Sequence, residues 1–284
     1  MSRVSRVSRT NRTYRTNRMH GSNGVSEHRS LSRPARIGCG TLAVIALIVV
    51  WQIAVDVSGV STRVMASPSQ IVGVFASSWS DVLAPATLVT WLEGLCGFVC
   101  AIPLGIGVGI LLYLSPIASA ALNPLLITLQ TLPLIAIAPL FVIWFGFEPI
   151  GKIVMVLVLS FFPIAVQTTR GLAAVPRFYD DVALTCGAGK AWTLFHVKLR
   201  VAARQILGGM RIAAVYVYGT AVTAEYLGAR QGLGIVLQSA FNSFQTPLIF
   251  AATLIIIALT GLLVGLVSLL ERFWAVETVA DYRP

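Results

Sequence analysis

Six long apolar stretches constrain the fold of this chain more than any other feature of its sequence. They occupy residues 38–57, 87–114, 118–146, 150–170, 206–227 and 248–270. Each exceeds the roughly 18 residues that a helix needs to cross a bilayer. Only 11% of the residues are charged and 56% are hydrophobic, whereas soluble domains carry about 25% charged residues. The sequence therefore predicts an all-α polytopic membrane protein with about six transmembrane helices and excludes a soluble globular domain.

Basic residues predict the orientation of these spans. Nine arginines precede residue 37, and six basic residues lie between positions 170 and 204. The alternate connections hold only Arg63, Lys152 and Arg230. Because Lys and Arg accumulate on the cytoplasmic side of a membrane, both termini and the segment 171–204 are expected in the cytoplasm.

Residues 1–36 are rich in Arg, Ser, Thr and Asn and have almost no large apolar side chains. Burial in such a segment does not offset the entropy of ordering, so a disordered basic tail is expected. We interpret its arginines as a topology signal, or the tail as an over-long start with Met19 as the alternative start, in preference to attraction of the arginines to anionic lipid headgroups. The first apolar stretch is too long for a cleavable signal peptide. The transmembrane domain is predicted over 37–273, followed by a cytoplasmic tail over 274–284.

Local motifs predict a helix start and two packing faces. Ser67 is a favourable N-cap, Pro68 suits the first helical turn, and Gln70 has the capping-box spacing. A helix is therefore expected from Pro68. Glycines four residues apart, which permit close helix approach, occur at Gly105 and Gly109 in the second span and at Gly261 and Gly265 in the last.

The segment 171–204 is too apolar for a plain connector. Its large apolar side chains, which need a surface to bury against, are Phe178, Val182, Trp192, Phe195 and Val197. Small residues between positions 183 and 189 would let a partner approach closely, which predicts a docking element. The Gly189-Lys190 pair is no phosphate-binding loop, because Leu184 and Ala191 replace the required Gly and Ser or Thr. The chain is therefore not expected to bind ATP itself.

The spacing within this loop resembles a known family. The matching residues are Asp181, Val182, Ala183, Gly187, Val197 and Leu199. They resemble the cytoplasmic loop of the inner-membrane permeases of binding-protein-dependent ABC importers, in the nitrate, sulfonate, taurine and thiamine-precursor group. That loop reads Glu-Ala-Ala, three residues, Gly, about nine residues, an aliphatic residue and Leu-Pro. Arg200 and Arg204 stand where the family usually has prolines.

The resemblance extends over about residues 51 to 272. Ser67–Ser69 resembles the outer loop of the family, and Leu132–Leu140 with Trp144–Gly146 resembles its third span. Three short stretches look most like the subgroup that imports the pyrimidine precursor of thiamine: Glu225–Ala229, Gly232–Gly234 and Asn242–Thr246.

This resemblance implies an ABC-importer permease fold in the bacterial inner membrane. It implies a second permease subunit, forming a homodimer, a cytoplasmic ATPase whose groove takes the loop helix, and an extracytoplasmic solute-binding protein. The implied coupling surface is Asp181, Val182, Ala183, Leu184, Gly187 and Ala188. Because the ATPase hydrolyses ATP, the chain itself is expected to be a transport subunit and no enzyme. An aminopyrimidine is the first expected solute, with alkanesulfonate, taurine or nitrate as alternatives.

Polar residues and one proline within spans are candidates for the translocation path. They are Gln130, Thr131, Pro133, Tyr216, Tyr218, Thr220 and Glu225. Pro133 frees a backbone carbonyl and predicts a kink. A tyrosine ring could stack on a flat heteroaromatic solute or simply pack, and Glu225 could instead cap a helix or contact the following loop. Arg211 is expected to snorkel to the headgroups or to line the path, and Glu93 to anchor a span at the interface.

Other functional classes lack their required residues. An ion-coupled secondary transporter needs intramembrane acids or broken-helix ion sites and repeated halves, which the sequence does not show convincingly. An intramembrane enzyme would need a nucleophile and base. The four cysteines, at positions 39, 96, 100 and 186, show no paired spacing, so neither a metal site nor a cofactor is expected.

Overall fold

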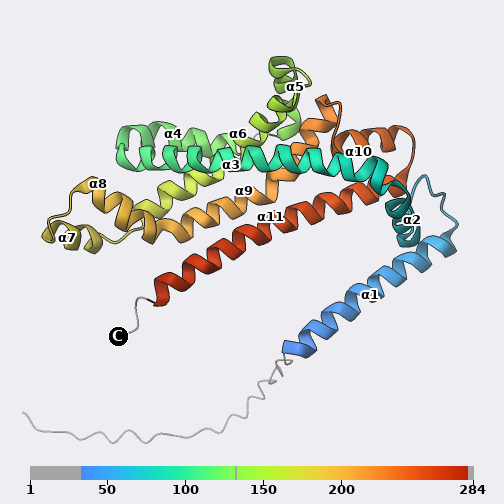
Figure 1. Ribbon diagram of the computed structural model, residues 1–284, viewed down its shortest axis with the longest axis horizontal. Helices are drawn as coiled ribbons and strands as arrows, with labels where there is room; N and C mark the ends of the chain where they lie inside the picture. The colour runs from blue at the N-terminus through green and yellow to red at the C-terminus, as the bar shows by residue number, and fades with distance from the viewer. Residues whose placement is uncertain (1–32, 132, 281–284) are drawn as a thin grey trace, which may run out of the picture. The chain divides into compact units, whose positions relative to one another are not determined.

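The computed structural model of the protein describes residues 33–131 and 133–280, and within these residues it contains helices and no strand, which confirms the all-α fold (Figure 1). The helices are α1 Arg33–Ser58, α2 Pro68–Ser78, η1 Trp79–Leu83, α3 Ala84–Leu114, α4 Pro116–Leu129, α5 Leu134–Phe145, α6 Pro149–Ala173, α7 Phe178–Thr185, α8 Lys190–Thr193, η2 Leu194–Lys198, α9 Leu199–Gly228, α10 Leu233–Asn242 and α11 Thr246–Ala280. The two segments labelled η are π-helical.

The ends of the described chain differ from the predicted tails. The prediction of a disordered tail over 1–36 falls mostly on residues 1–32, which lie outside the described residues, and α1 begins at Arg33. At the other end α11 continues to Ala280, into the predicted tail 274–284. The described residues divide between Leu47 and Ile48 into two compact units, and all helices from α2 onward belong to the second.

Helix α2 begins where the capping signal predicts it. The Ser67 side chain accepts from the Gln70 N–H at 3.5 Å, and the Gln70 side chain accepts from the Ser67 N–H at 3.1 Å. Together these bonds satisfy two backbone donors at the helix start. Ile71 on this helix is buried in an apolar core that also contains residues of α9, α10 and α11.

Helices α3 and α6 pack closely and run parallel. An added Cβ would lie 2.7 Å from Val156 at Gly97, 2.7 Å from Ile164 at Gly105 and 2.5 Å from Thr168 at Gly109. Each contact joins residues 59 positions apart, so the two helices advance in step. The Thr169 hydroxyl donates to the Gly109 carbonyl at 3.1 Å near the shared end. These contacts confirm the predicted close packing at Gly105 and Gly109.

The second glycine pair has no such neighbour among the described residues of this chain. At Gly261 and Gly265 an added Cβ would meet nothing within 4 Å. Four-residue glycine spacing permits close approach of a second helix, but the fold determines whether a second helix lies there.

We expect Gly109→Ala to destabilise the protein by about 1–3 kcal/mol, because the added methyl would overlap Thr168 and the Ala165 carbonyl. Gly107→Ala is the matched control, since an added Cβ there meets nothing within 4 Å. Thermal unfolding of the purified proteins in detergent should show a lower midpoint for Gly109→Ala alone. Equal midpoints for the two variants would contradict this packing.

Helix α9 packs antiparallel on α6 and completes the core. An added Cβ at Gly171 would lie 2.8 Å from Gln205, and one at Gly209 would lie 2.8 Å from Gln167. The main apolar cluster joins residues of α3, α6, α9 and α11, with Tyr218 only 1% exposed. In Figure 1, α3, α6 and α9 lie side by side.

The apolar stretch 118–146, predicted as one spanning helix, is divided into α4 and α5. Pro133 is the N-cap of α5 with ψ 118° and has no N–H to continue a helical ladder. The helices have 14 and 12 residues, so each is about 18–21 Å long, shorter than the roughly 30 Å of a bilayer core. Because α3 and α6 run parallel, the chain between them has to return along their length, and α4 and α5 together make that return.

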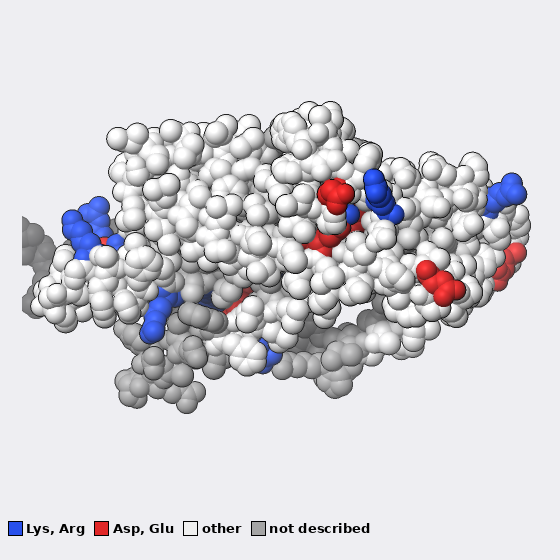
Figure 2. Space-filling view, turned by 45° about the horizontal axis from the view of Figure 1, so that its top comes forward, with Lys and Arg blue, Asp and Glu red and all other residues white. Residues whose placement is uncertain are grey.

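Within the part of the chain that the structure describes, five helical segments are long and apolar enough to cross a membrane: Thr41–Ser58, Pro68–Leu114, Pro149–Ala173, Lys190–Gly228 and Thr246–Phe273. Large apolar side chains on them are exposed, among them Leu88 at 55% and Ile257 at 61%. Figure 2 shows charged side chains at only a few places on one face of the molecule. Such a surface fits lipid, where apolar side chains need no cover from the protein.

Candidate functional site

The loop between α6 and α9 contains a short helix with a defined end. The Gly187 N–H bonds the Leu184 carbonyl at 3.0 Å, and the Ala188 N–H bonds the Ala183 carbonyl at 2.9 Å. With Gly187 at φ 79°, this is the Schellman ending of α7. Glycine suits the position because other L-residues are strained at this φ. The glycine of the predicted loop motif therefore fixes where α7 stops.

The six predicted coupling residues all lie on α7 or directly after it. Asp181, Val182, Leu184 and Gly187 are exposed, Ala188 is half-buried and Ala183 is buried. Val182 is 44% exposed and Leu184 is 55% exposed. The large apolar side chains that flank them, Phe178 and Trp192, are also exposed. An exposed apolar surface of this kind is typical of a site for another protein.

An open hollow of about 690 Å³ lies within this loop. Phe178 and Val182 of α7, Gly187 after it, and Trp192 of α8 are among the residues that line it. An added Cβ at Gly187 or Gly189 would meet nothing within 4 Å, so the backbone is accessible from the hollow. We name these four lining residues, with Leu184, the loop surface.

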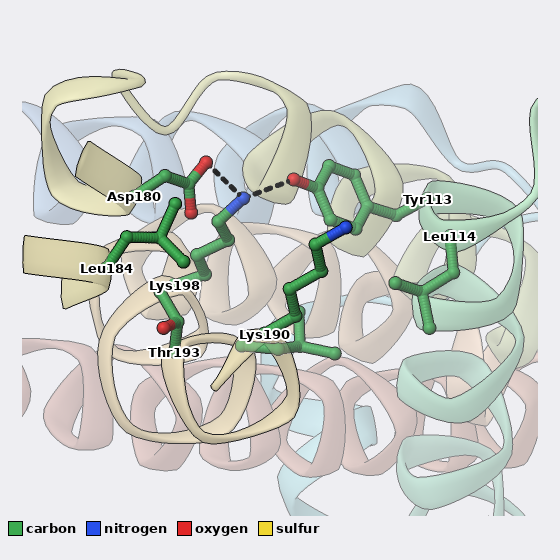
Figure 3. A pocket seen from close by; sticks show the side chains of 8 residues that line it. Tyr113, Leu114, Asp180, Leu184, Lys190, Thr193 and Lys198 are labelled. Carbon is green, nitrogen blue, oxygen red and sulfur yellow. Dashed lines mark hydrogen bonds and ion pairs between the residues drawn. The ribbon is translucent and has the colours of Figure 1, made fainter. Parts of the chain in front are cut away.

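One ionic contact connects α7 with the end of α3. The Lys198 ammonium lies 2.7 Å from Asp180 Oδ2 and donates to the Tyr113 hydroxyl at 2.7 Å. Figure 3 shows this contact beside a second hollow, of about 300 Å³, which Lys190 and Leu114 also line. The loop therefore lies at the end of the bundle where α3 and α6 finish.

An apolar cluster supports the other side of the loop. Leu194 of η2, Leu172 of α6 and Ile206 of α9 are buried together, and Tyr113 of α3 packs against them. The start of α9 is thus joined to the spans by packing. The loop and the spans are one connected structure at this end.

The seven predicted path residues have different environments. Gln130, Thr131, Pro133 and Tyr216 are exposed, whereas Tyr218, Thr220 and Glu225 are buried. The Tyr218 ring packs against Gly94, where an added Cβ would lie 2.7 Å from the ring. Glu225 accepts from the Gly234 N–H at 2.7 Å at the start of α10. The three buried residues therefore contact neighbouring helices, and the four exposed residues are the ones that a solute can reach.

A buried ion pair joins α3 and α6, and the sequence reasoning missed it. Lys152 Nζ lies 2.5 Å from Glu93 Oε1, and their side chains are 6% and 5% exposed. Glu93 was expected to anchor a span at the interface, but it lies inside the bundle. Charges within spans nearly always pair, so a search for a partner among the few membrane-level charges would have found Lys152.

Arg211 also has a partner. It forms an ion pair with Glu271 of α11. The expectation that Arg211 snorkels or lines the path did not include this pairing. Glu271 lies 60 positions further along the chain, so no local sequence pattern connects the two.

Comparisons with known proteins identify a family. The family described as binding-protein-dependent transport system inner membrane component matches residues 101–275. The matched segment includes the whole loop between α6 and α9.

Several named proteins are similar to this chain over most of their length. The chain is 34% identical over 227 residues to the formylaminopyrimidine transport permease protein of Halalkalibacterium halodurans, covering 78% of this chain and 88% of that protein. It is 32% identical over 227 residues to the riboflavin transport system permease protein of Chloroflexus aurantiacus, covering 80% and 85%. It is 31% identical over 254 residues to the taurine transport system permease protein of Escherichia coli, covering 85% and 90%.

A solved structure shares the fold. A chain of the MetNI methionine ABC transporter, in an inward-facing conformation, aligns with a TM-score of 0.60. The alignment covers 68% of this chain and 96% of that chain at 19% identity. At this identity the similarity concerns the fold alone.

Proposed function

Because the chain belongs to the family of inner-membrane components of binding-protein-dependent transport systems, we propose that it carries a small heteroaromatic solute of the aminopyrimidine class into the cell. It is the permease subunit of an ABC importer and a multi-pass membrane protein. Its relatives are transport subunits. Membership of this family implies an ATPase and a solute-binding protein as partners.

The observation that carries the mechanism is the loop surface. Exposed apolar side chains of α7 and α8 surround a hollow of about 690 Å³ at the end of the bundle. In the proposed complex, a side chain of the cytoplasmic ATPase occupies this hollow, and α7 lies against the ATPase. The residues that contact the ATPase are those predicted from the loop motif, with Ala183 as the small buried residue beneath them.

The proposed transport cycle uses this contact. When the ATPase subunits close on ATP, they move α7, and the joined ends of α3, α6 and α9 move with it. Rocking of these helices exposes the solute path alternately to the two sides of the membrane. In our proposal this end and both termini lie in the cytoplasm, which the basic residues concentrated in the loop and before α1 support. A second copy of the chain completes the path.

Charge supports a weakly charged solute over a strong anion. A sulfonate or nitrate crossing the membrane needs a positive group to offset its desolvation. Lys152 is paired with Glu93 and Arg211 is paired with Glu271, so neither is available to an anion. The exposed residues Gln130, Thr131 and Tyr216 offer hydrogen bonds and an aromatic face to a flat polar ring.

Uptake by proteoliposomes tests the proposal. The chain is reconstituted with its ATPase and binding protein, and labelled aminopyrimidine and labelled taurine are offered separately. We expect ATP-dependent uptake of the aminopyrimidine and no uptake of either solute when the ATPase is omitted. Uptake of taurine alone would contradict the proposed solute, and uptake without the ATPase would contradict the proposed energy source in favour of an ion-coupled transporter.

A further inference from the structure

Lys198 contacts two helices that are far apart in the sequence. Its ammonium lies 2.7 Å from Asp180 of α7 and 2.7 Å from the hydroxyl of Tyr113, one residue before the end of α3. The same ammonium lies 5.2 Å from the centroid of the Tyr113 ring. Lys198 itself is the last residue of η2 and leads directly into α9. Figure 3 shows the lysine between the carboxylate and the phenol.

The packing of α7 against the spans is otherwise small. Its large apolar side chains Phe178, Val182 and Leu184 are exposed, and of its apolar side chains Ala183 is the buried one. Backbone bonds of α7 are local, such as that from the Asp181 N–H to the Arg177 carbonyl at 3.1 Å. A helix that leaves its apolar face free for a partner depends more on polar contacts for its position on the bundle.

This contact differs from an ordinary surface salt bridge. Exposed ion pairs contribute little because water screens them and both side chains lose rotamer freedom. Here the Lys198 side chain is 13% exposed and the Asp180 side chain is 33% exposed. The ammonium also has two acceptors, which fix it in one geometry. Because the lysine is partly buried and contacts two acceptors, it holds α7 and α3 at a defined separation.

We infer that Lys198 is a positioning residue that transmits movement of α7 to the end of α3 through Asp180 and Tyr113. The inference rests on the proposed docking of the ATPase at α7. Helix α3 packs on α6 through Gly97, Gly105 and Gly109, so a displacement of its end is shared along both helices. The ionic link thus adds a route from the ATPase to α3 beside the covalent route into α9.

Amide hydrogen exchange of the full complex measures this transmission directly. ATPase subunits and a non-hydrolysable ATP analogue are added to the purified chain in detergent, and exchange is followed in α7 and in residues 108–114 of α3. In the unmodified protein we expect slower exchange in both segments. In Tyr113→Phe, which keeps the ring and loses the hydroxyl, α7 should remain protected. The added protection of residues 108–114 should fall by at least about fivefold.

Further variants separate transmission from local stability. Asp180→Ala breaks the link on the α7 side and leaves the bond between Lys198 and Tyr113 in place, so it should also lose protection in residues 108–114. Lys198→Arg keeps the charge and should retain it. Tyr226→Phe, at the opposite end of α9, is the matched control and should behave like the unmodified protein.

The outcomes distinguish the inference from the proposed function. If α7 gains no protection from the ATPase in the unmodified protein, the proposed docking is wrong and the inference falls with it. If α7 is protected but residues 108–114 are not, or if Tyr113→Phe and Asp180→Ala both retain the protection of residues 108–114, docking stands and the role of Lys198 is overturned.

Discussion

Replacing Lys152 by Met is expected to remove most of the folded protein from the membrane. The Lys152 ammonium is 2.5 Å from Glu93 and both side chains are nearly fully buried. Removing one partner of a buried ion pair costs about 3–5 kcal/mol, because the other charge stays buried without compensation. That cost is a large fraction of the free energy of unfolding of many proteins. Size-exclusion chromatography of detergent extracts, with a fluorescent tag, measures the folded fraction.

The double variant Glu93→Gln with Lys152→Met supplies the control. It removes both charges at once, and replacement of a whole buried pair by neutral residues is often tolerated. We therefore expect the double variant to recover most of the folded peak that Lys152→Met loses. A double variant as unstable as the single one would show that the charge pairing is not the cause. A single variant with a normal peak would contradict the buried pair itself.

The second large effect is expected from Gly187→Trp, which should abolish ATP-driven uptake while leaving insertion and folding of the spans intact. Gly187 is exposed beside the hollow, and an added Cβ meets nothing within 4 Å, so an indole there would fill the space that the ATPase needs. Uptake into proteoliposomes and the amount of folded protein are measured together. Normal uptake with normal expression would contradict docking at this surface.

Gly187→Ala separates bulk from backbone strain. Both variants place a Cβ at φ 79°, where an L-residue costs about 1–2 kcal/mol, but only Trp fills the hollow. We expect Gly187→Ala to weaken the end of α7 and to retain part of the uptake. Equal loss of uptake in the two variants would show that the cause is the strained end of α7 and not the filled hollow.

Features that depend on residues close together in the sequence were predictable from it. Five of the six apolar stretches coincide with helices long and apolar enough to cross a membrane, because crossing a bilayer requires length and hydrophobicity that few other structures need. Ser67 and Gln70 predicted the start of α2, because a capping box is formed within four residues. The large apolar and small residues of the loop predicted a docking element, which stays a prediction, and the Schellman ending that explains Gly187 required the backbone angles.

The break between α4 and α5 was harder to predict. The apolar stretch continues through Pro133, and prolines occur inside other helices of this chain, such as Pro163 in α6. In a membrane bundle, neighbouring helices decide whether a proline kinks a helix or ends it. The sequence alone therefore predicted a kink where the structure has two helices.

Contacts between residues far apart in the sequence were not predicted. Gly97, Gly105 and Gly109 of α3 lie against α6, whereas Gly261 and Gly265 lie against none of the described residues of this chain. Lys152 with Glu93 and Arg211 with Glu271 pair across helices far apart in the sequence. Tyr218, Thr220 and Glu225 were proposed as path residues because they carry polar groups within a span, but they are buried between helices. Which side of a helix meets a neighbour depends on the packing of the whole bundle.

Cross-linking from Cys186 tests the central claim most directly, because this exposed cysteine lines the hollow of the loop. The other three cysteines, Cys39, Cys96 and Cys100, are replaced by Ser, and a photoactivated maleimide reagent is attached to Cys186 in membranes that contain the ATPase. We expect one main product that joins this chain to the ATPase subunit, and we expect Gly187→Trp to remove it. The account is contradicted if Cys186 yields no ATPase product while a control cysteine at exposed Val72 of α2 yields one.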